Sequence, residues 1–143
     1  MNILHLTLIA HFAATWALVG TIWTVQLVHY PLFRHVGKSQ FQAYHARHVL
    51  AVSWVVVPLT LLEWVTAAVL VFTLDRSFWF LCSLPLLVVI VWSTWRMQVP
   101  IHSRLQAGFD EATQCRLERS NWVRTVCWTL RGVLVAVALD CEF

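Results

Sequence analysis

The first 33 residues of this chain contain no Asp, Glu, Lys or Arg, and the first charged side chain is that of Arg34. Over all 143 residues, 59% are hydrophobic and only 12% are charged, about half of the ~25% charged residues usual in soluble domains. A soluble domain of this size cannot enclose so much apolar surface, and disorder requires the opposite composition. The chain is therefore predicted to be an integral membrane protein, with the lipid bilayer as its main partner.

Four segments are apolar and long enough to cross a bilayer, which takes about 20 residues in a helix. They cover approximately 4–33, 49–74, 78–99 and 121–139. Because the sequence lacks the short alternating strands of a membrane barrel, we predict an all-α, antiparallel four-helix bundle. It forms a single transmembrane domain over 1–143, with two helical hairpins that extend past the membrane.

The two hairpins carry signals for helix ends. Ser39 and Gln42 are spaced as in a capping box, which predicts a helix start in the first hairpin. In the second hairpin, Gly108 is expected to end one helix and Asp110 to cap the next.

Positive charge predicts the orientation in the membrane. Eight of the ten Lys and Arg residues lie in or beside the two long connections, and positively charged connections tend to stay in the cytoplasm. We therefore expect a multi-pass protein of the bacterial inner membrane with both termini outside. The small net charge of +3, without a basic stripe interleaved with aromatic residues, argues against a nucleic-acid partner.

Histidines gather near the predicted cytoplasmic surface. In an antiparallel hairpin that turns at Gly37, residues equally far from the turn lie level, which places His29 beside His45. His48 shares a helix face with His45, and His102 is expected at the same depth. Four imidazoles at one level favour a site for haem, copper, zinc or iron. The alternative interpretation is that these histidines are only hydrated at the headgroup boundary.

A second polar cluster is expected deeper in the bundle, formed by His11, Glu63 and Arg131. Counted from the turns at about 1.5 Å per residue, Glu63 and Arg131 differ in height by about 5 Å. Because a lone charge is costly in hydrocarbon, we predict that both face the interior and pair, with His11 beside Glu63. Such a group either fixes the order of the helices or serves as a ligand anchor or proton relay.

One face of the fourth span carries two arginines and an indole. The residues of this stripe are Asn121, Arg124, Trp128 and Arg131. Two cations beside an aromatic ring favour an anionic or aromatic ligand. We therefore expect Arg124 and Arg131, together with Glu63 and His11, to hold a cofactor or a small aromatic or quinone-like ligand.

Two sequence stretches carry a resemblance to a known family. The first is V-Q-L-V-H-Y-P-L-F followed by Gly37 and F-x-x-Y-H-x-x-H; the second is V-P-I-H-S-R-L followed by Gly108 and N-W-V-R-T. The chain resembles uncharacterised bacterial four-helix membrane proteins of the anthrone-oxygenase-like type. A fainter resemblance, through His11, Trp16 and Gly20, is to the membrane protoporphyrinogen oxidase of haem synthesis. These resemblances imply a membrane oxidoreductase or oxygenase.

A different class of function remains open. The sequence contains no phosphate-binding loop, nucleophile elbow or HExxH motif, and its four cysteines form no CxxC pair. The small size and nine tryptophans also suit a non-enzymatic accessory or assembly subunit, within a homo-oligomer or a larger membrane complex. A transporter is a third possibility, since the deep charge pair can relay protons.

Overall fold

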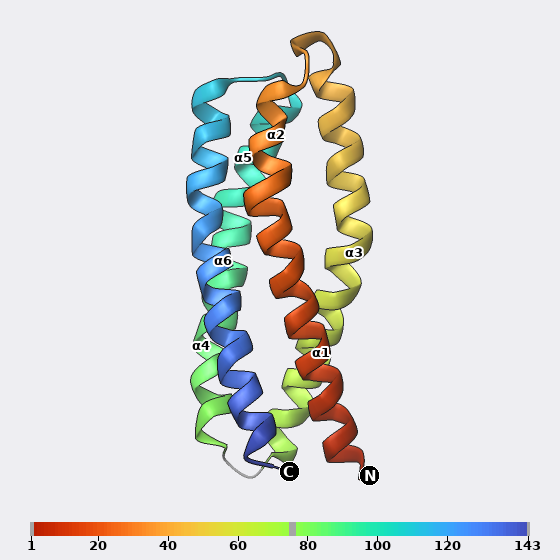
Figure 1. Ribbon diagram of the computed structural model, residues 1–143, viewed down its shortest axis with the longest axis vertical. Helices are drawn as coiled ribbons and strands as arrows, with labels where there is room; N and C mark the ends of the chain where they lie inside the picture. Colours follow the sequence, from red (N-terminus) through yellow and green to blue (C-terminus); the bar gives the residue numbers. More distant parts are fainter. Residues whose placement is uncertain (1, 75–76, 143) are drawn as a thin grey trace.

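The computed structural model describes residues 2–74 and 77–142. Four long helical segments cover Ile3–His35, Lys38–Thr73, Phe78–Gln106 and Glu111–Asp140, and each is long and apolar enough to cross a membrane. Both termini lie at one end of the bundle, the terminal end, and the two long connections lie at the other, the connection end (Figure 1). The predicted all-α, antiparallel four-helix bundle is confirmed.

Two of the four segments change helix type along their length. The first consists of α1 (Ile3–Thr24), the π-helical η1 (Val25–His29), α2 (Tyr30–Leu32) and the 3₁₀ turn η2 (Phe33–His35). The second is α3 (Lys38–Thr73). The third consists of α4 (Phe78–Ser93), the π-helical η3 (Thr94–Gln98) and α5 (Val99–Gln106), and the fourth is α6 (Glu111–Asp140).

Proline accounts for the position of both π-helical segments. Pro31 and Pro100 lack an N–H, and a proline ring clashes with the carbonyl four residues earlier in a regular helix. In each case the residue just before the proline, Tyr30 or Val99, donates its N–H to the carbonyl five residues back instead. The wider turn holds one extra residue, and one residue corresponds to about 100° of rotation around a helix. The side chains beyond each wide turn therefore point in different directions from those of an unbroken helix.

The hairpin ends agree with the sequence signals in one case and depart from them in the other. The Asp110 carboxylate accepts a hydrogen bond from the N–H of Thr113 at 2.8 Å, as predicted for a cap, and hydrogen bonds from Thr113 hold the Asp110 pKa below its usual value. The capping box at Ser39 is wrong, because α3 already begins at Lys38 and has no side-chain cap. Gln42 instead donates to the carbonyl of Ala107 at 2.7 Å and joins the two hairpins.

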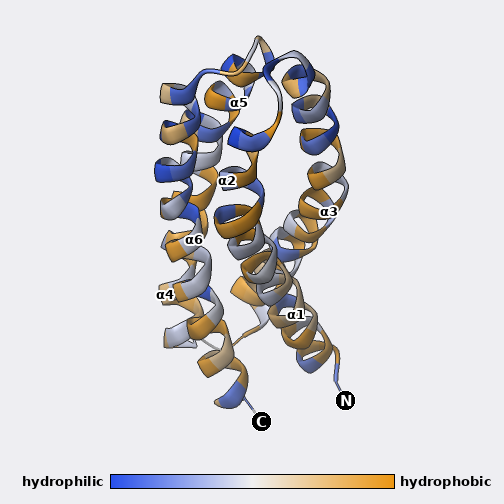
Figure 2. Ribbon diagram, turned by 45° about the horizontal axis from the view of Figure 1, so that its top comes forward, coloured by the Kyte–Doolittle hydropathy of each residue, from blue (hydrophilic) through white to orange (hydrophobic). Residues whose placement is uncertain are grey.

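Apolar clusters close the bundle at both ends. At the terminal end, Leu8, Leu70, Phe80 and Ala138 bring all four segments together. At the connection end, a second cluster is formed by Val25, Tyr30, Phe33, Phe41, Ile101, Leu105 and Leu117. Between these ends α6 packs along α1 and α4, whereas α3 packs mainly on α1. Hydrophilic residues concentrate toward the connection end, while hydrophobic residues cover the middle of the bundle (Figure 2).

Candidate functional site

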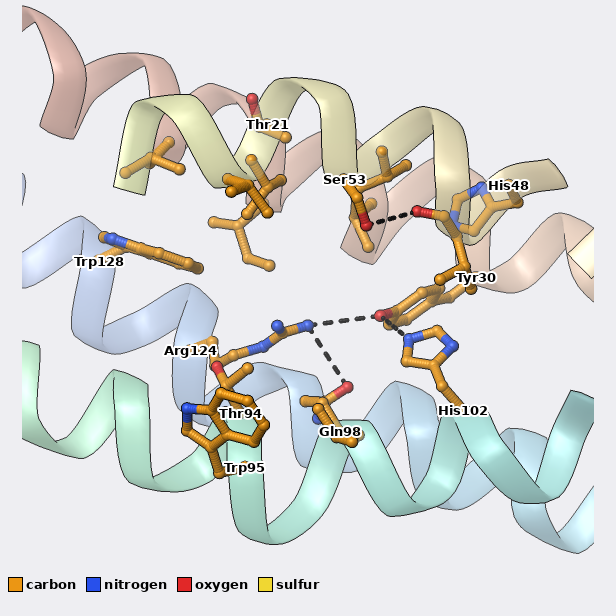
Figure 3. A pocket seen from close by; sticks show the side chains of 18 of the residues that line it. Thr21, Tyr30, His48, Ser53, Thr94, Trp95, Gln98, His102, Arg124 and Trp128 are labelled. Atoms are coloured by element: carbon orange, nitrogen blue, oxygen red, sulfur yellow. Dashed lines mark hydrogen bonds between the residues drawn. The ribbon is translucent and has the colours of Figure 1, made fainter. Parts of the chain in front are cut away.

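A cavity of about 500 Å³ lies between α3 and the third segment, with α1 and α6 also contributing to its wall. Most of its lining surface is apolar, and aliphatic side chains such as Leu18, Ile22, Val52 and Val56 contribute to it. In Figure 3 the Arg124 side chain lies between the indole rings of Trp95 and Trp128, and its guanidinium points toward Tyr30 and Gln98. The cavity therefore combines a large apolar surface with a small polar region.

Arg124 is the centre of this polar region. Its Nη2 donates to the Tyr30 hydroxyl and to Gln98 Oε1, both at 3.4 Å, and its Nε donates to Asn121 Oδ1 at 2.9 Å. All three acceptors are neutral. Within residues 2–74 and 77–142, the ion pairs of Lys and Arg are Arg34–Glu118 and Arg131–Glu63. The Arg124 charge therefore has no carboxylate partner in that part of the chain.

Two of the three partners of Arg124 lie in or directly after the proline-linked π-helical segments. Tyr30 is the last residue before Pro31, and Gln98 is the last residue of η3, two positions before Pro100. Sequence reasoning did not single out Tyr30 or Gln98 as site residues. The available signal was a proline within a membrane-spanning helix next to a polar side chain, because such a proline reorients its neighbours.

The predicted histidine cluster is divided into two pairs. His45 Nε2 lies 3.0 Å from His102 Nδ1, and His102 Nε2 lies 2.9 Å from the Tyr30 hydroxyl. His29 packs against His48, with ring centroids 5.3 Å apart, and His48 also lines the cavity. The expected level pairing of His29 with His45 is thus shifted by about one turn.

This arrangement does not form a metal-ligand set. Both ring nitrogens of His102 are engaged in hydrogen bonds, one of them with His45. Among the residues that the structure describes, no group of three or more His, Cys, Asp or Glu side chains is placed to hold a metal ion. We therefore derive no chemistry from a metal at the four histidines.

In the deep cluster Glu63 and Arg131 pair as predicted, whereas His11 bonds to Arg131 and Thr66 rather than to the Glu63 carboxylate. Arg131 Nε donates to Glu63 Oε1 at 2.9 Å, and both side chains are completely buried. Arg131 Nη2 lies 3.0 Å from His11 Nε2, and Nη1 donates to the carbonyl and hydroxyl oxygens of Ser83. Thr15 donates a further hydrogen bond to Glu63. The predicted pairing of Glu63 and Arg131 in the interior is confirmed.

The hydrogen bonds of this cluster also fix the state of His11. A guanidinium only donates, so His11 Nε2 must accept from Arg131 and carry no proton. His11 Nδ1 then holds the proton and donates to Thr66 Oγ1 at 2.7 Å, and the ring is neutral. Of the four residues expected to hold a ligand, Arg124 lines the cavity, whereas Arg131, Glu63 and His11 bond to one another and to their surroundings.

No protein-family model matches the chain, and no curated protein or solved structure matches it.

Proposed function

We propose that this protein binds a lipid-soluble aromatic or quinone-like ligand in the cavity, with Arg124 holding an oxygen atom of the ligand. The observation that carries the proposal is a cation on the wall of a cavity whose lining surface is mainly apolar. Among residues 2–74 and 77–142 this cation has no carboxylate partner. An uncompensated charge is costly in an environment of low dielectric. A ligand oxygen with full or partial negative charge relieves that cost.

The shape of the cavity supports a ligand of moderate size. Small-molecule sites in proteins typically enclose about 300–1,000 Å³ and combine apolar walls with a few convergent polar groups. The volume of about 500 Å³ lies within this range. The two indoles and the aliphatic side chains suit a flat ring system, and Arg124, Tyr30 and Gln98 suit its polar substituents.

The position of the cavity supports entry from the bilayer. Val57 and Trp95 both line the cavity, yet 52% and 68% of their surfaces remain exposed. These side chains lie on segments apolar enough to span a membrane, so this part of the rim is expected to face lipid. A ligand dissolved in the bilayer can therefore reach Arg124 by sliding between α3 and the third segment.

For the activity, we propose a membrane oxidoreductase or oxygenase acting on this ligand, the class that the family resemblance implies. Phenolic and quinone-like compounds undergo redox chemistry at the oxygens that an arginine binds well. We also propose a location in the bacterial inner membrane with both connections in the cytoplasm, on the basis of the Lys and Arg distribution.

The proposal can be tested with alizarin, a flat quinone with ionisable hydroxyl groups. Its binding to the full chain in lipid nanodiscs is measured by quenching of tryptophan fluorescence. We expect Arg124→Gln to weaken binding at least about tenfold, since a hydrogen bond to a charged group contributes about 1.5–3 kcal/mol. Arg119→Gln, which changes an exposed arginine of the same helix, is the matched control and should bind normally.

Two outcomes would contradict the proposal. Equal affinities for the wild type and both variants would show that the dye does not use Arg124. Failure of the wild type to bind alizarin would overturn the proposal, and purification in one discrete larger complex would then favour an accessory subunit.

A further inference from the structure

We infer that Tyr30, His102 and His45 form a proton relay leading out of the cavity, and that the ligand belongs to a class whose hydroxyl group ionises in the site. This inference rests on the proposed function, because it requires a ligand oxygen beside Arg124. It narrows the ligand to phenols, hydroquinones and enols. Carboxylates and phosphates would need the charge of Arg124 but no path for a proton.

The three side chains form one continuous line of hydrogen bonds across three segments. The Tyr30 hydroxyl at the start of α2 lies 2.9 Å from His102 Nε2 on α5, and His102 Nδ1 lies 3.0 Å from His45 Nε2 on α3. Tyr30 and His102 also line the cavity, where Figure 3 shows the hydroxyl of Tyr30 between Arg124 and His102. His45 is completely buried among the rings of Phe33 and Phe41.

The line can hold its protons in two ways while every group stays neutral. In the first, Tyr30 donates to His102 Nε2, His102 Nδ1 donates to His45 Nε2, and His45 carries its proton on Nδ1. In the second, every donor is reversed, so that the Tyr30 proton is free to point into the cavity and His45 Nδ1 is bare. Arg124 fits both arrangements, because it donates to the Tyr30 oxygen in each.

Passing from the first arrangement to the second moves one proton through the line. The ligand hydroxyl gives its proton to Tyr30, Tyr30 gives its own to His102 Nε2, and His102 Nδ1 gives one to His45 Nε2. The proton on His45 Nδ1 then passes to a water molecule that transiently reaches this atom, and the water carries it away as hydronium. One proton enters at the cavity, one leaves at His45, and the ligand becomes an anion beside Arg124; the reverse sequence protonates the ligand.

The far end of the line points to transport of protons rather than to a closed structural network. Buried polar atoms nearly always have a hydrogen-bond partner. His45 Nδ1 is buried and has none among the residues that the structure describes. The proton leaves or enters the line at this atom. The unpartnered nitrogen is therefore at the position where a relay needs a transient proton acceptor.

Other titratable groups adjoin the line without interrupting it. Arg124 of α6 contacts Tyr30 directly, and His48 of α3 packs against the Tyr30 ring with centroids 6.5 Å apart. His29 of η1 lies behind His48. An experiment on the relay must therefore separate the rate of proton transfer from the ionisation equilibrium, which these neighbours also influence.

A pH jump with alizarin bound in nanodiscs makes that separation, because the colour of the dye reports ionisation of its hydroxyl. The rate of the colour change is measured by stopped flow. We expect Tyr30→Phe to bind alizarin through Arg124 but to slow the change about 10²-fold, the lower range of what positioned acids and bases contribute. His45→Gln should slow it likewise, because an amide keeps a hydrogen bond to His102 but does not shuttle a proton.

Two matched variants serve as controls. Tyr44→Phe changes the other tyrosine of the chain, and His35→Gln changes an exposed histidine at the connection end. Both should retain the wild-type rate. If all proteins bind the dye and Tyr30→Phe reacts at the wild-type rate, the relay is overturned while the proposed function survives. If the wild type does not bind the dye, the proposed function fails and the relay fails with it.

Discussion

The buried pair of Glu63 and Arg131 provides the sharpest test of how this bundle is stabilised. Replacing Arg131 by Gln leaves the Glu63 carboxylate with hydrogen bonds from Thr15 and Trp128 but no counter-charge. Replacing Glu63 by Gln leaves the Arg131 guanidinium with Ser83 and His11, which are neutral. Each single substitution therefore strands one charge in the interior, whereas the double substitution removes both.

The expected magnitude can be worked from the geometry. At a separation of 2.9 Å and an effective dielectric constant of about 20, the attraction is about 6 kcal/mol. Much of this offsets desolvation, so breaking such a pair typically lowers the free energy of unfolding by about 3–5 kcal/mol. For a chain of this length the loss corresponds to a decrease in melting temperature of about 10–20 °C.

The assay is a double-mutant cycle on protein purified in a mild detergent, with unfolding measured by circular dichroism. We expect each single variant to lose about 3–5 kcal/mol and the double variant to lose clearly less than the sum. The exposed pair Arg34–Glu118, with a separation of 2.7 Å, is the control cycle, and its coupling should be below about 1 kcal/mol. Additive losses at Glu63 and Arg131 would refute the reasoning, since they would mean that the two charges do not stabilise each other.

Three further predictions concern the membrane topology, the helix packing and the helix cap. Gln40→Cys in an otherwise cysteine-free chain should react with a membrane-impermeant maleimide added from the cytoplasmic side. Labelling in intact cells would show that the protein has the opposite orientation. Gly20→Ala should raise the free energy of unfolding by about 1 kcal/mol in thermal melts, because the added Cβ meets open space; Gly132→Ala should gain less, because its Cβ would lie 3.2 Å from Val19. The pKa of Asp110 is lowered in the folded chain, so its ionised carboxylate stabilises the fold above the unfolded-state pKa. This stabilisation is lost as the pH falls through the lowered value. The melting temperature should therefore fall below about pH 4, and it should fall less in Asp110→Asn.

The sequence alone was sufficient to predict the arrangement of four antiparallel helices. The four spans are set by local hydropathy, because a bilayer selects any helix whose own side chains are apolar enough. The cap at Asp110 is equally local, since the carboxylate reaches only three residues ahead. The pairing of Glu63 with Arg131 is a long-range contact, yet it was predictable because buried charges of opposite sign have few other ways to lower their energy.

Which residues form the candidate site depends on the direction in which each side chain points. Counting residues along the chain does not give this direction. Counting from a turn gives the height of a side chain but not its rotation about the helix axis. The π-turns before Pro31 and Pro100 each add a residue and so rotate the rest of the helix by about 100°. For this reason Tyr30 and Gln98 accept hydrogen bonds from Arg124, and His45 lies within hydrogen-bond distance of His102 in the other hairpin.

The contrast between Arg124 and Arg131 shows most clearly what only the tertiary structure decided. The two arginines lie seven residues apart on one face of α6, about 10 Å in height, and the sequence assigned both to one ligand site. Where α1, α3 and α4 converge, Glu63, Ser83 and His11 reach Arg131 and satisfy it. At the height of Arg124 the structure provides a cavity and neutral acceptors. The difference arises from the spacing between helices, which is set by packing over the whole bundle rather than by any local stretch of sequence.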